Sequence, residues 1–283
     1  IVEWLRIGFI HGVMNTDNTA ICGETIDFGP CAMMGSYDEK AVFSSIDENG
    51  RYAYGNQGKI AQWNMARLAD CLLPLLIEGN NGEGNETEKE QQAIAKVETV
   101  IHQFTSKFDD AYYVMYANKL GMRQVNLDNQ TFSDNKALVD ELLVIMKAQR
   151  LDYTQTFYYL TQSLTDSNKE EELNRQLGDW YKAWVAMLKN LKISKQEAKK
   201  LMAVNNPVVI PRNHHVEALL AHCEQAVADS AAQNETHGPA SITEIVDEFL
   251  DVLRSPYQAL DATKNYQDTP EDNDRYYQTF CGT

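Results

Sequence analysis

A change of pattern near residue 58 is the feature that most restricts how this chain can fold. Residues 1–58 are rich in glycine and show no long hydrophobic period, whereas the later residues place apolar side chains at helical spacing. Leu138, Leu142 and Met146, for example, fall on one helical face. We therefore predict a mainly α fold, with a small strand content confined to the first 58 residues.

Two kinds of interruption divide the helical part. The polar run from Glu78 to Glu90 contains three glycines, but no Lys-Ser/Thr follows it, so we interpret it as a solvated connection and not as a phosphate-binding loop. Pro207 and Pro211 exclude a continuous helix through "NNPVVIPRNHH". A helix is expected to begin with the capping box formed by Ser194 and Glu197.

Charge and composition limit the partners of the protein. The 283 residues contain 25 Lys and Arg against 41 Asp and Glu, which gives a formal net charge of −16. A field of this sign repels nucleic acid, so an anionic ligand needs a local cation. No apolar run reaches the length of a membrane span. Five cysteines without CxxC spacing favour a reducing compartment. We expect no nucleic-acid or membrane partner and a cytoplasmic location.

The candidate site lies in "HGVMNTDNTAICGETIDFG", from His11 to Gly29. Asn18 offers an amide oxygen and Asp27 a carboxylate, which are ligand types that Mg²⁺ or Mn²⁺ prefers. A short loop that turns at Gly23 could bring the two side chains to one point, and Gly29 would allow a sharp turn after Asp27. We predict that Asn18 and Asp27 are metal ligands.

Asp17, next to Asn18, is the candidate catalytic residue. An ordinary aspartate is a weak base at neutral pH, but its carboxylate can orient a hydroxyl and accept the proton late in a phosphoryl or nucleotidyl transfer. His11 is expected to be a structural brace. The alternative interpretation is structural throughout, because Asn-Thr-Asp-Asn is ordinary turn composition and Asp-Phe-Gly also occurs by chance.

Two further groups of residues are interpreted as structural. Trp180, Trp184 and Met187 have the spacing of a buried helical stripe. His214 and His215 stand at an expected helix start, and adjacent helical side chains point to different faces. A zinc site formed by this pair alone is therefore not expected.

Asp27 to Gly29 and the spacing from His11 to Asn18 resemble the metal-binding triplet and the catalytic loop of protein kinases. The catalytic aspartate of kinases would stand at position 13, where this chain has Val13. Ordinary kinase activity is thus the weakest alternative, and Asp17 is the candidate for a relocated base.

The runs "GFIHGVMNTDNTAICGETIDFGPCAMM" and "GRYAYGNQGKIAQWNMARLADCLLPLL" strongly resemble the selenoprotein O family, kinase-fold protein adenylyltransferases once classed as pseudokinases. The resemblance implies the C-lobe of a protein-kinase-like fold with a helical C-terminal extension. Residues 1–77 would form the catalytic and metal-binding segment, and residues 78–283 the helical remainder of the same continuous domain.

The resemblance also implies a function for a bacterial, cytoplasmic protein: transfer of AMP from ATP to Ser, Thr or Tyr hydroxyls of protein substrates. Asp17 would be the proton acceptor. Asn18 and Asp27 would bind Mg²⁺ or Mn²⁺, with Asp27 also lying against the nucleotide. The remaining alternative is a non-catalytic pseudokinase scaffold that binds protein partners.

Several departures from the family pattern qualify this expectation. The chain starts at Ile1, so the N-lobe of the family, with its phosphate-binding cations, would lie upstream; the chain alone is therefore expected to be inactive. Cys281 stands where eukaryotic relatives carry selenocysteine, but the cysteine partner expected near Phe43 is missing. Gly58 replaces a proline that is usual in the family.

Overall fold

The computed structural model describes residues 1–79, 85–123, 129–232, 240–270, 274 and 276–280. Helices predominate in these residues, as predicted. The helices are α1 (Val2–Ile7), α2 (Gln57–Glu78), α3 (Glu86–Lys119), α4 (Asn129–Gln149), α5 (Tyr153–Ser163), α6 (Ser167–Leu177), α7 (Asp179–Asn190), α8 (Lys195–Asn205), α9 (Asn213–Ala232) and α10 (Ala240–Arg254), with short 3-10 turns η1 (Thr16–Asn18), η2 (Tyr54–Asn56) and η3 (Ala262–Tyr266).

The strands are short and lie near the N-terminus, which confirms the predicted position of the β content. β1 (Phe9–Ile10) pairs antiparallel with β2 (Ala32–Met33), with Phe9 opposite Met33. The two strands bracket the candidate site loop, so their pairing brings the two ends of that loop together.

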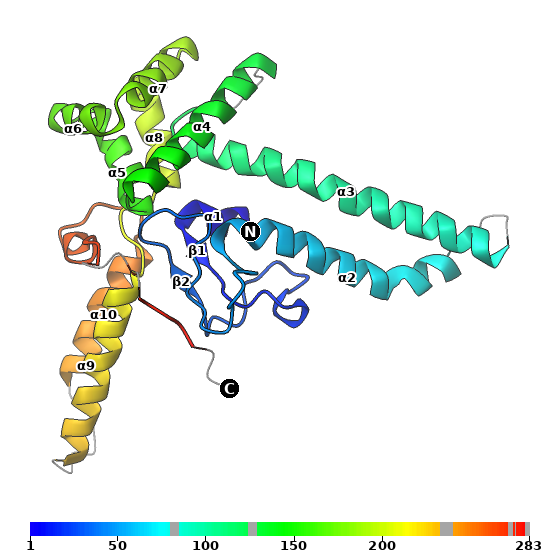
Figure 1. Cartoon of the computed structure of the whole chain (residues 1–283). Helices are drawn as coiled ribbons and strands as arrows, with labels where there is room; N and C mark the ends of the chain where they lie inside the picture. Colours follow the sequence, from blue (N-terminus) through cyan, green and yellow to red (C-terminus); the bar gives the residue numbers. More distant parts are fainter. Residues whose placement is uncertain (80–84, 124–128, 233–239, 271–273, 275, 281–283) are drawn as a thin grey trace.

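Three groups of helices surround this N-terminal part (Figure 1). α2 and α3 form a long antiparallel hairpin that projects to one side. α4 to α8 cluster at one end of this hairpin, and α9 with α10 forms a second hairpin that projects in another direction. Pro207 and Pro211 lie in the extended segment between α8 and α9, where the sequence predicted a break.

The main core lies between α1, the N-terminal segment and the helices α3 to α8. The predicted stripe on α7 is part of it: Trp180 and Trp184 are buried, and Met187 is partly buried against them. Each indole N–H donates to a helix carbonyl, Trp180 to Leu138 and Trp184 to Leu120, at 2.8 Å in both cases. The buried polar atoms of these large side chains are therefore satisfied.

Three tyrosines, Tyr54, Tyr116 and Tyr153, form a buried group that we call the tyrosine cluster. The hydroxyls of Tyr54 and Tyr153 donate to the carbonyl of Leu5 at 2.6 and 2.8 Å, and Tyr153 is also bonded to the Tyr116 hydroxyl at 3.0 Å. Burial raises the pKa of all three phenols well above the ordinary value. The cluster joins η2 and α5 to α1 through the Leu5 carbonyl, and α3 to both through the Tyr116 hydroxyl.

Local signals set several helix starts. The predicted capping box of Ser194 and Glu197 opens α8, and a second one, Asn85 with Glu88, opens α3. α2 ends at Glu78, where the polar run begins, and α3 begins at Glu86, before that run ends at Glu90. Within the described residues, none of the helices combines the length and apolar character needed to cross a lipid bilayer.

Candidate functional site

Asn18 and Asp27, the two predicted metal ligands, lie in hydrogen-bonding contact. The Asn18 Nδ2 atom donates to Asp27 Oδ2 at 2.8 Å. η1 carries Asn18, and the chain turns back through Gly23, which has a φ of 79°. That left-handed conformation is favourable for glycine, so the predicted turn at Gly23 is confirmed.

The second predicted turn, after Asp27, is also present. Asp27 itself has a φ of 55°, whereas Gly29 is not among the residues with positive φ. Aspartate tolerates the left-handed region better than most non-glycine residues, and such conformations concentrate at functional sites. The predicted turn at Gly29 is present without a left-handed glycine, because the Cys31 N–H donates to the Phe28 carbonyl at 3.2 Å across Gly29 and Pro30.

The orientation of Asn18 leaves two oxygens available. Its Nδ2 atom also donates to the Val13 carbonyl at 3.1 Å, so both amide hydrogens point into the loop. In the described part of the chain, Asn18 Oδ1 and Asp27 Oδ1 accept no hydrogen bond. Asp27 is exposed and Asn18 is half-buried. One amide oxygen and one carboxylate oxygen, on two side chains in contact, thus accept no hydrogen bond from the described residues.

His11 braces the two ends of the site loop. It is fully buried, its Nδ1 accepts from the Val13 backbone N–H at 3.4 Å, and its Nε2 bonds the Ile26 carbonyl at 2.7 Å. The ring stacks on Trp4 at a centroid distance of 5.2 Å. These contacts confirm the structural role predicted for His11, since they fix the residue that precedes Asp27.

α2 anchors the same loop through two buried polar residues that the sequence analysis did not single out. Gln57 accepts from the His11 N–H at 3.1 Å and donates to the Phe9 carbonyl at 3.0 Å. Asn64 donates to the Met14 carbonyl at 3.1 Å and to Thr19 Oγ1 at 2.7 Å. The two side chains are seven residues apart, so they share one helical face. Polar residues at this spacing on an otherwise apolar face are the signal that could have identified them.

Gly12 brings the loop against the chain that follows Asp-Phe-Gly. It has a φ of 83°, and a Cβ atom at this position would lie 2.5 Å from the Pro30 carbonyl oxygen. Only glycine permits this approach, so Gly12 is needed both for the backbone conformation and for the contact.

Asp17 is next to Asn18 in η1, but its side chain points to solvent. The carboxylate is exposed and forms no hydrogen bond or ion pair with any residue that the structure describes. No described lysine or arginine forms an ion pair with Asp17 or Asp27. The site residues within the described ranges therefore contribute negative charge without a paired cation.

The C-terminal segment packs against the residues that follow the site loop. Thr279 bridges Ser44, donates from its backbone N–H to the Phe43 carbonyl at 2.8 Å, and donates from its hydroxyl to the Pro30 carbonyl at 2.6 Å. This places the segment just before Cys281 beside Phe43, where the family pattern led us to expect a cysteine partner. Cys281 itself lies outside the described residues, and the four described cysteines are unpaired.

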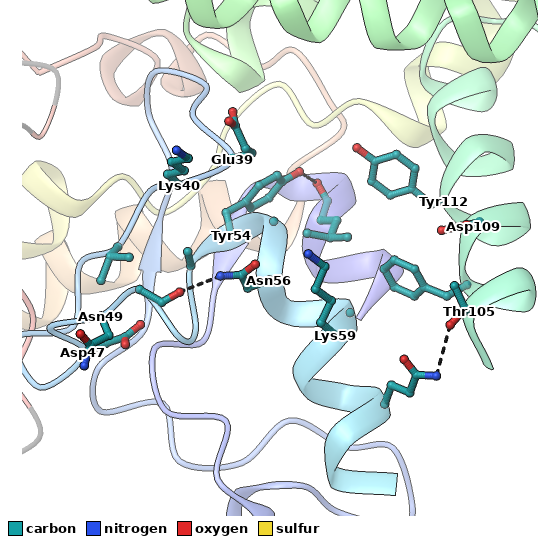
Figure 2. A pocket seen from close by; sticks show the side chains of 18 of the residues that line it. Glu39, Lys40, Asp47, Asn49, Tyr54, Asn56, Lys59, Thr105, Asp109 and Tyr112 are labelled. Carbon is teal, nitrogen blue, oxygen red and sulfur yellow. Dashed lines mark hydrogen bonds between the residues drawn. The ribbon is translucent and has the colours of Figure 1, made fainter. Parts of the chain in front are cut away.

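A cavity of about 840 Å³ opens between the 39–59 segment and α3. Figure 2 shows Lys59 of α2 between the loop that carries Glu39 and the helix that carries Asp109 and Tyr112. A second cavity of about 460 Å³ adjoins it and reaches Val13 and Asn15, in the site loop. The residues that line both cavities are Asp47, Glu48 and Asn49.

Gly58 on the wall of the larger cavity explains one departure from the family pattern. A Cβ atom at Gly58 would lie 2.5 Å from the tip of the Phe108 ring. In this chain the aromatic side chain occupies the space that a larger residue at position 58 would need.

Fold and site together define a mainly helical protein with a loop site where the Asn18 amide group contacts the Asp27 carboxylate. The sequence model of the family described as "Protein adenylyltransferase SelO" matches residues 1–237. The chain therefore belongs to the SelO family.

Similar proteins named "Protein nucleotidyltransferase YdiU" occur in Teredinibacter turnerae, at 45% identity, and in Anoxybacillus flavithermus, at 41% identity, each over 283 residues. A protein of the same name in Pseudoalteromonas translucida is 40% identical over the same length. In each case the match covers all of this chain but 52% of the relative, so the chain spans about half the length of these proteins.

Proposed function

We propose that this chain is the C-terminal part of a protein adenylyltransferase that transfers AMP from ATP to hydroxyl groups of proteins. Membership of the SelO family and the nucleotidyltransferase names of its relatives support the reaction class. The observation that carries the proposal to particular residues is the 2.8 Å contact between Asn18 and Asp27. In this proposal the chain is the C-lobe of a kinase-like fold, with residues 1–77 as the catalytic segment and residues 78–283 as its helical continuation.

Asn18 and Asp27 fit a site for Mg²⁺ or Mn²⁺. One oxygen of each is free of hydrogen bonds to described residues, and carboxylate with amide oxygen is a donor set that hard divalent cations prefer. A bound cation would neutralise part of the triphosphate charge. The hydrogen bonds that hold Asn18 to Val13 and Asp27, together with the His11 brace, keep these two ligands in place.

Asp17 is proposed to accept the proton of the acceptor hydroxyl. Its carboxylate is exposed and not engaged by any described neighbour, so it is accessible to an incoming side chain. Its place beside Asn18 in η1 keeps it within one turn of the metal ligands. A carboxylate in this position orients the hydroxyl and takes its proton late in the transfer.

The phosphates of ATP need cationic partners. The described site residues, however, form no ion pair with a lysine or an arginine. Preorganised positive groups provide much of the stabilisation in such transfers. We therefore propose that residues 1–283 alone do not transfer AMP, and that the cationic part of the site belongs to the remainder of the protein.

The adjoining cavities are proposed to receive the acceptor protein. They lead from Val13 and Asn15 in the site loop to Asp109 and Tyr112 on α3. The larger cavity is lined by four carboxylates against two amines: Glu39, Asp47, Glu48 and Asp109 against Lys40 and Lys59. This excess of negative charge favours a basic segment around the acceptor hydroxyl.

Mass spectrometry of a protein acceptor incubated with the full-length protein and ATP tests the proposal. An added AMP supports it. An added phosphate would instead indicate kinase activity, and no modification would favour the scaffold alternative, for which Val13 is the supporting feature. The same assay on residues 1–283 alone is expected to give no product, and AMP incorporation there would contradict the proposed need for the rest of the protein.

Variants of the full-length protein separate the proposed roles. Asp17→Ala is expected to lower the rate of AMP transfer by at least about 100-fold while Mg-ATP binding persists, because general acid–base groups contribute about that much. Asp27→Ala is expected to weaken Mg-ATP binding as well. Asp179→Ala, which alters an exposed aspartate on α7, is the control and should change neither quantity. Transfer by Asp17→Ala at the wild-type rate would refute the role of Asp17 as base.

A further inference from the structure

A second group of metal-binding side chains lies where α9 meets the C-terminal segment. We propose that His214, His215 and Asp268 bind a zinc-class transition-metal ion. His215 Nε2 lies 2.8 Å from Asp268 Oδ1, and His214 Nε2 lies 3.4 Å from Asp268 Oδ2. One ligand atom from each of the three residues lies within 4.8 Å of the other two. The proposal is independent of the adenylyl transfer function and uses none of its residues.

The sequence did not indicate this site, because the prediction concerned the histidine pair alone. Adjacent helical residues point to different faces, but His214 and His215 occupy the first turn of α9, where both rings turn toward Asp268. Their ring centroids are 4.1 Å apart. The third ligand comes from beyond η3, 53 residues after His215, so nothing in the local sequence indicates it.

The distances suit a four-coordinate ion after small side-chain movements. Zinc bonds of about 2.0–2.1 Å to nitrogen and oxygen in a tetrahedron place neighbouring ligand atoms about 3.3 Å apart. The His214–Asp268 distance of 3.4 Å is measured to Oδ2 and the His215–Asp268 distance of 2.8 Å to Oδ1, so one histidine must shift toward the oxygen that binds the ion. Asp268 is 63% exposed, so its side chain is free to take part in that adjustment.

The segment that carries the histidines is rigidly held. Arg212 is buried and forms two bonds to the Asp152 carboxylate, at 2.8 and 3.1 Å. Asn213 bonds both the N–H and the carbonyl of Met33 in β2, at 3.0 and 2.9 Å. The residues just before the proposed ligands are thus fixed to the body of the protein, which is the support that a preorganised metal site requires.

The donor set and the exposure indicate the class of metal. Two imidazole nitrogens with one carboxylate suit zinc and its neighbours in the first transition series, whereas Mg²⁺ and Ca²⁺ prefer an all-oxygen set. His214 and His215 are 28% and 17% exposed, so the solvent side beside Asp268 leaves room for water as the fourth ligand. An ion here would join the segment after η3 to α9.

Zinc titration of the chelator-treated full-length protein by calorimetry tests the proposal. The expected result is one zinc ion bound per chain at this site, with affinity at least about 10-fold lower in His214→Ala, His215→Ala and Asp268→Asn. Asp268→Asn is the most informative variant, because an exposed side chain is changed to one of nearly equal size. His102→Ala and His222→Ala remove exposed histidines elsewhere and should leave binding unchanged.

Cobalt absorption gives a readout that does not depend on affinity. Co²⁺ in place of zinc is expected to show the ligand-field bands of a nitrogen- and oxygen-ligated four-coordinate site in the wild type and to lose them in Asp268→Asn. The proposal is overturned if the wild type binds no more zinc than Asp268→Asn does. It is also overturned if the histidine controls lower binding as much as the proposed ligands do.

Discussion

Substitution of Gly12 by alanine probes the contact that positions the site loop. Gly12 has a φ of 83°, and an added Cβ atom would lie 2.5 Å from the Pro30 carbonyl oxygen and 3.2 Å from the Ser44 Cβ. The left-handed backbone costs a non-glycine residue about 1–2 kcal/mol, and forcing an extra carbon into a packed site costs about 1–3 kcal/mol. Because the nearest atom belongs to the backbone, rotation of a side chain cannot relieve the clash. Gly12→Ala should therefore lower the free energy of unfolding by about 2–5 kcal/mol.

Gly23→Ala is the matched control for this prediction. Gly23 has a nearly equal φ of 79°, but nothing lies within 4 Å of the position of its missing Cβ. Only the backbone term of about 1–2 kcal/mol should remain. Denaturant titration followed by circular dichroism measures both variants against the wild type. Equal destabilisation by the two substitutions would refute the reasoning, since it would mean that the approach to Pro30 carries no energetic weight.

Three further predictions concern a buried ion pair, the tyrosine cluster and the acceptor cavity. Arg212→Ala leaves the buried Asp152 carboxylate without its ionic partner and should cost about 3–5 kcal/mol of unfolding free energy. Arg254→Ala removes an exposed ion pair and should cost at most about 1 kcal/mol. Similar losses for the two variants in denaturant titrations would contradict this prediction. Burial raises the pKa of the phenols in the tyrosine cluster, so their contribution to stability should be fully present below about pH 10, the ordinary pKa of a phenol in the unfolded chain, and should be lost above it. Denaturation midpoints measured from about pH 8 to 11 should therefore decline less steeply in Tyr116→Phe than in the wild type. Asp109→Lys should raise the KM for a basic peptide acceptor several-fold without changing the affinity for Mg-ATP. Asp110→Lys, which alters a residue outside the cavity lining, should leave this KM unchanged. Equal effects of the two substitutions would count against the proposed acceptor cavity.

The candidate site illustrates how far residue spacing predicts geometry. Asn18 and Asp27 are close in sequence and joined by a loop with a glycine, so their approach followed from the sequence, and the 2.8 Å contact confirms it. The left-handed backbone at Asp27 was not predicted, because aspartate adopts this conformation far less readily than glycine and no local pattern requires it. The anchoring by Gln57 and Asn64 was also missed, since a helical pattern gives the face of a side chain but not what that face contacts.

Helix content, helix breaks, capping boxes and the buried tryptophan stripe were determined by the sequence itself. Each depends on interactions within a few residues, through backbone hydrogen bonds and the helical repeat, and neighbouring residues specify these directly. The tertiary structure alone decided that Thr279 bridges Ser44, that Arg212 reaches Asp152 and that Asp268 meets the two histidines of α9. These contacts join residues that are 53 or more positions apart. They exist only because packing of the whole chain offsets the entropy of closing such long loops, and no local pattern records that outcome.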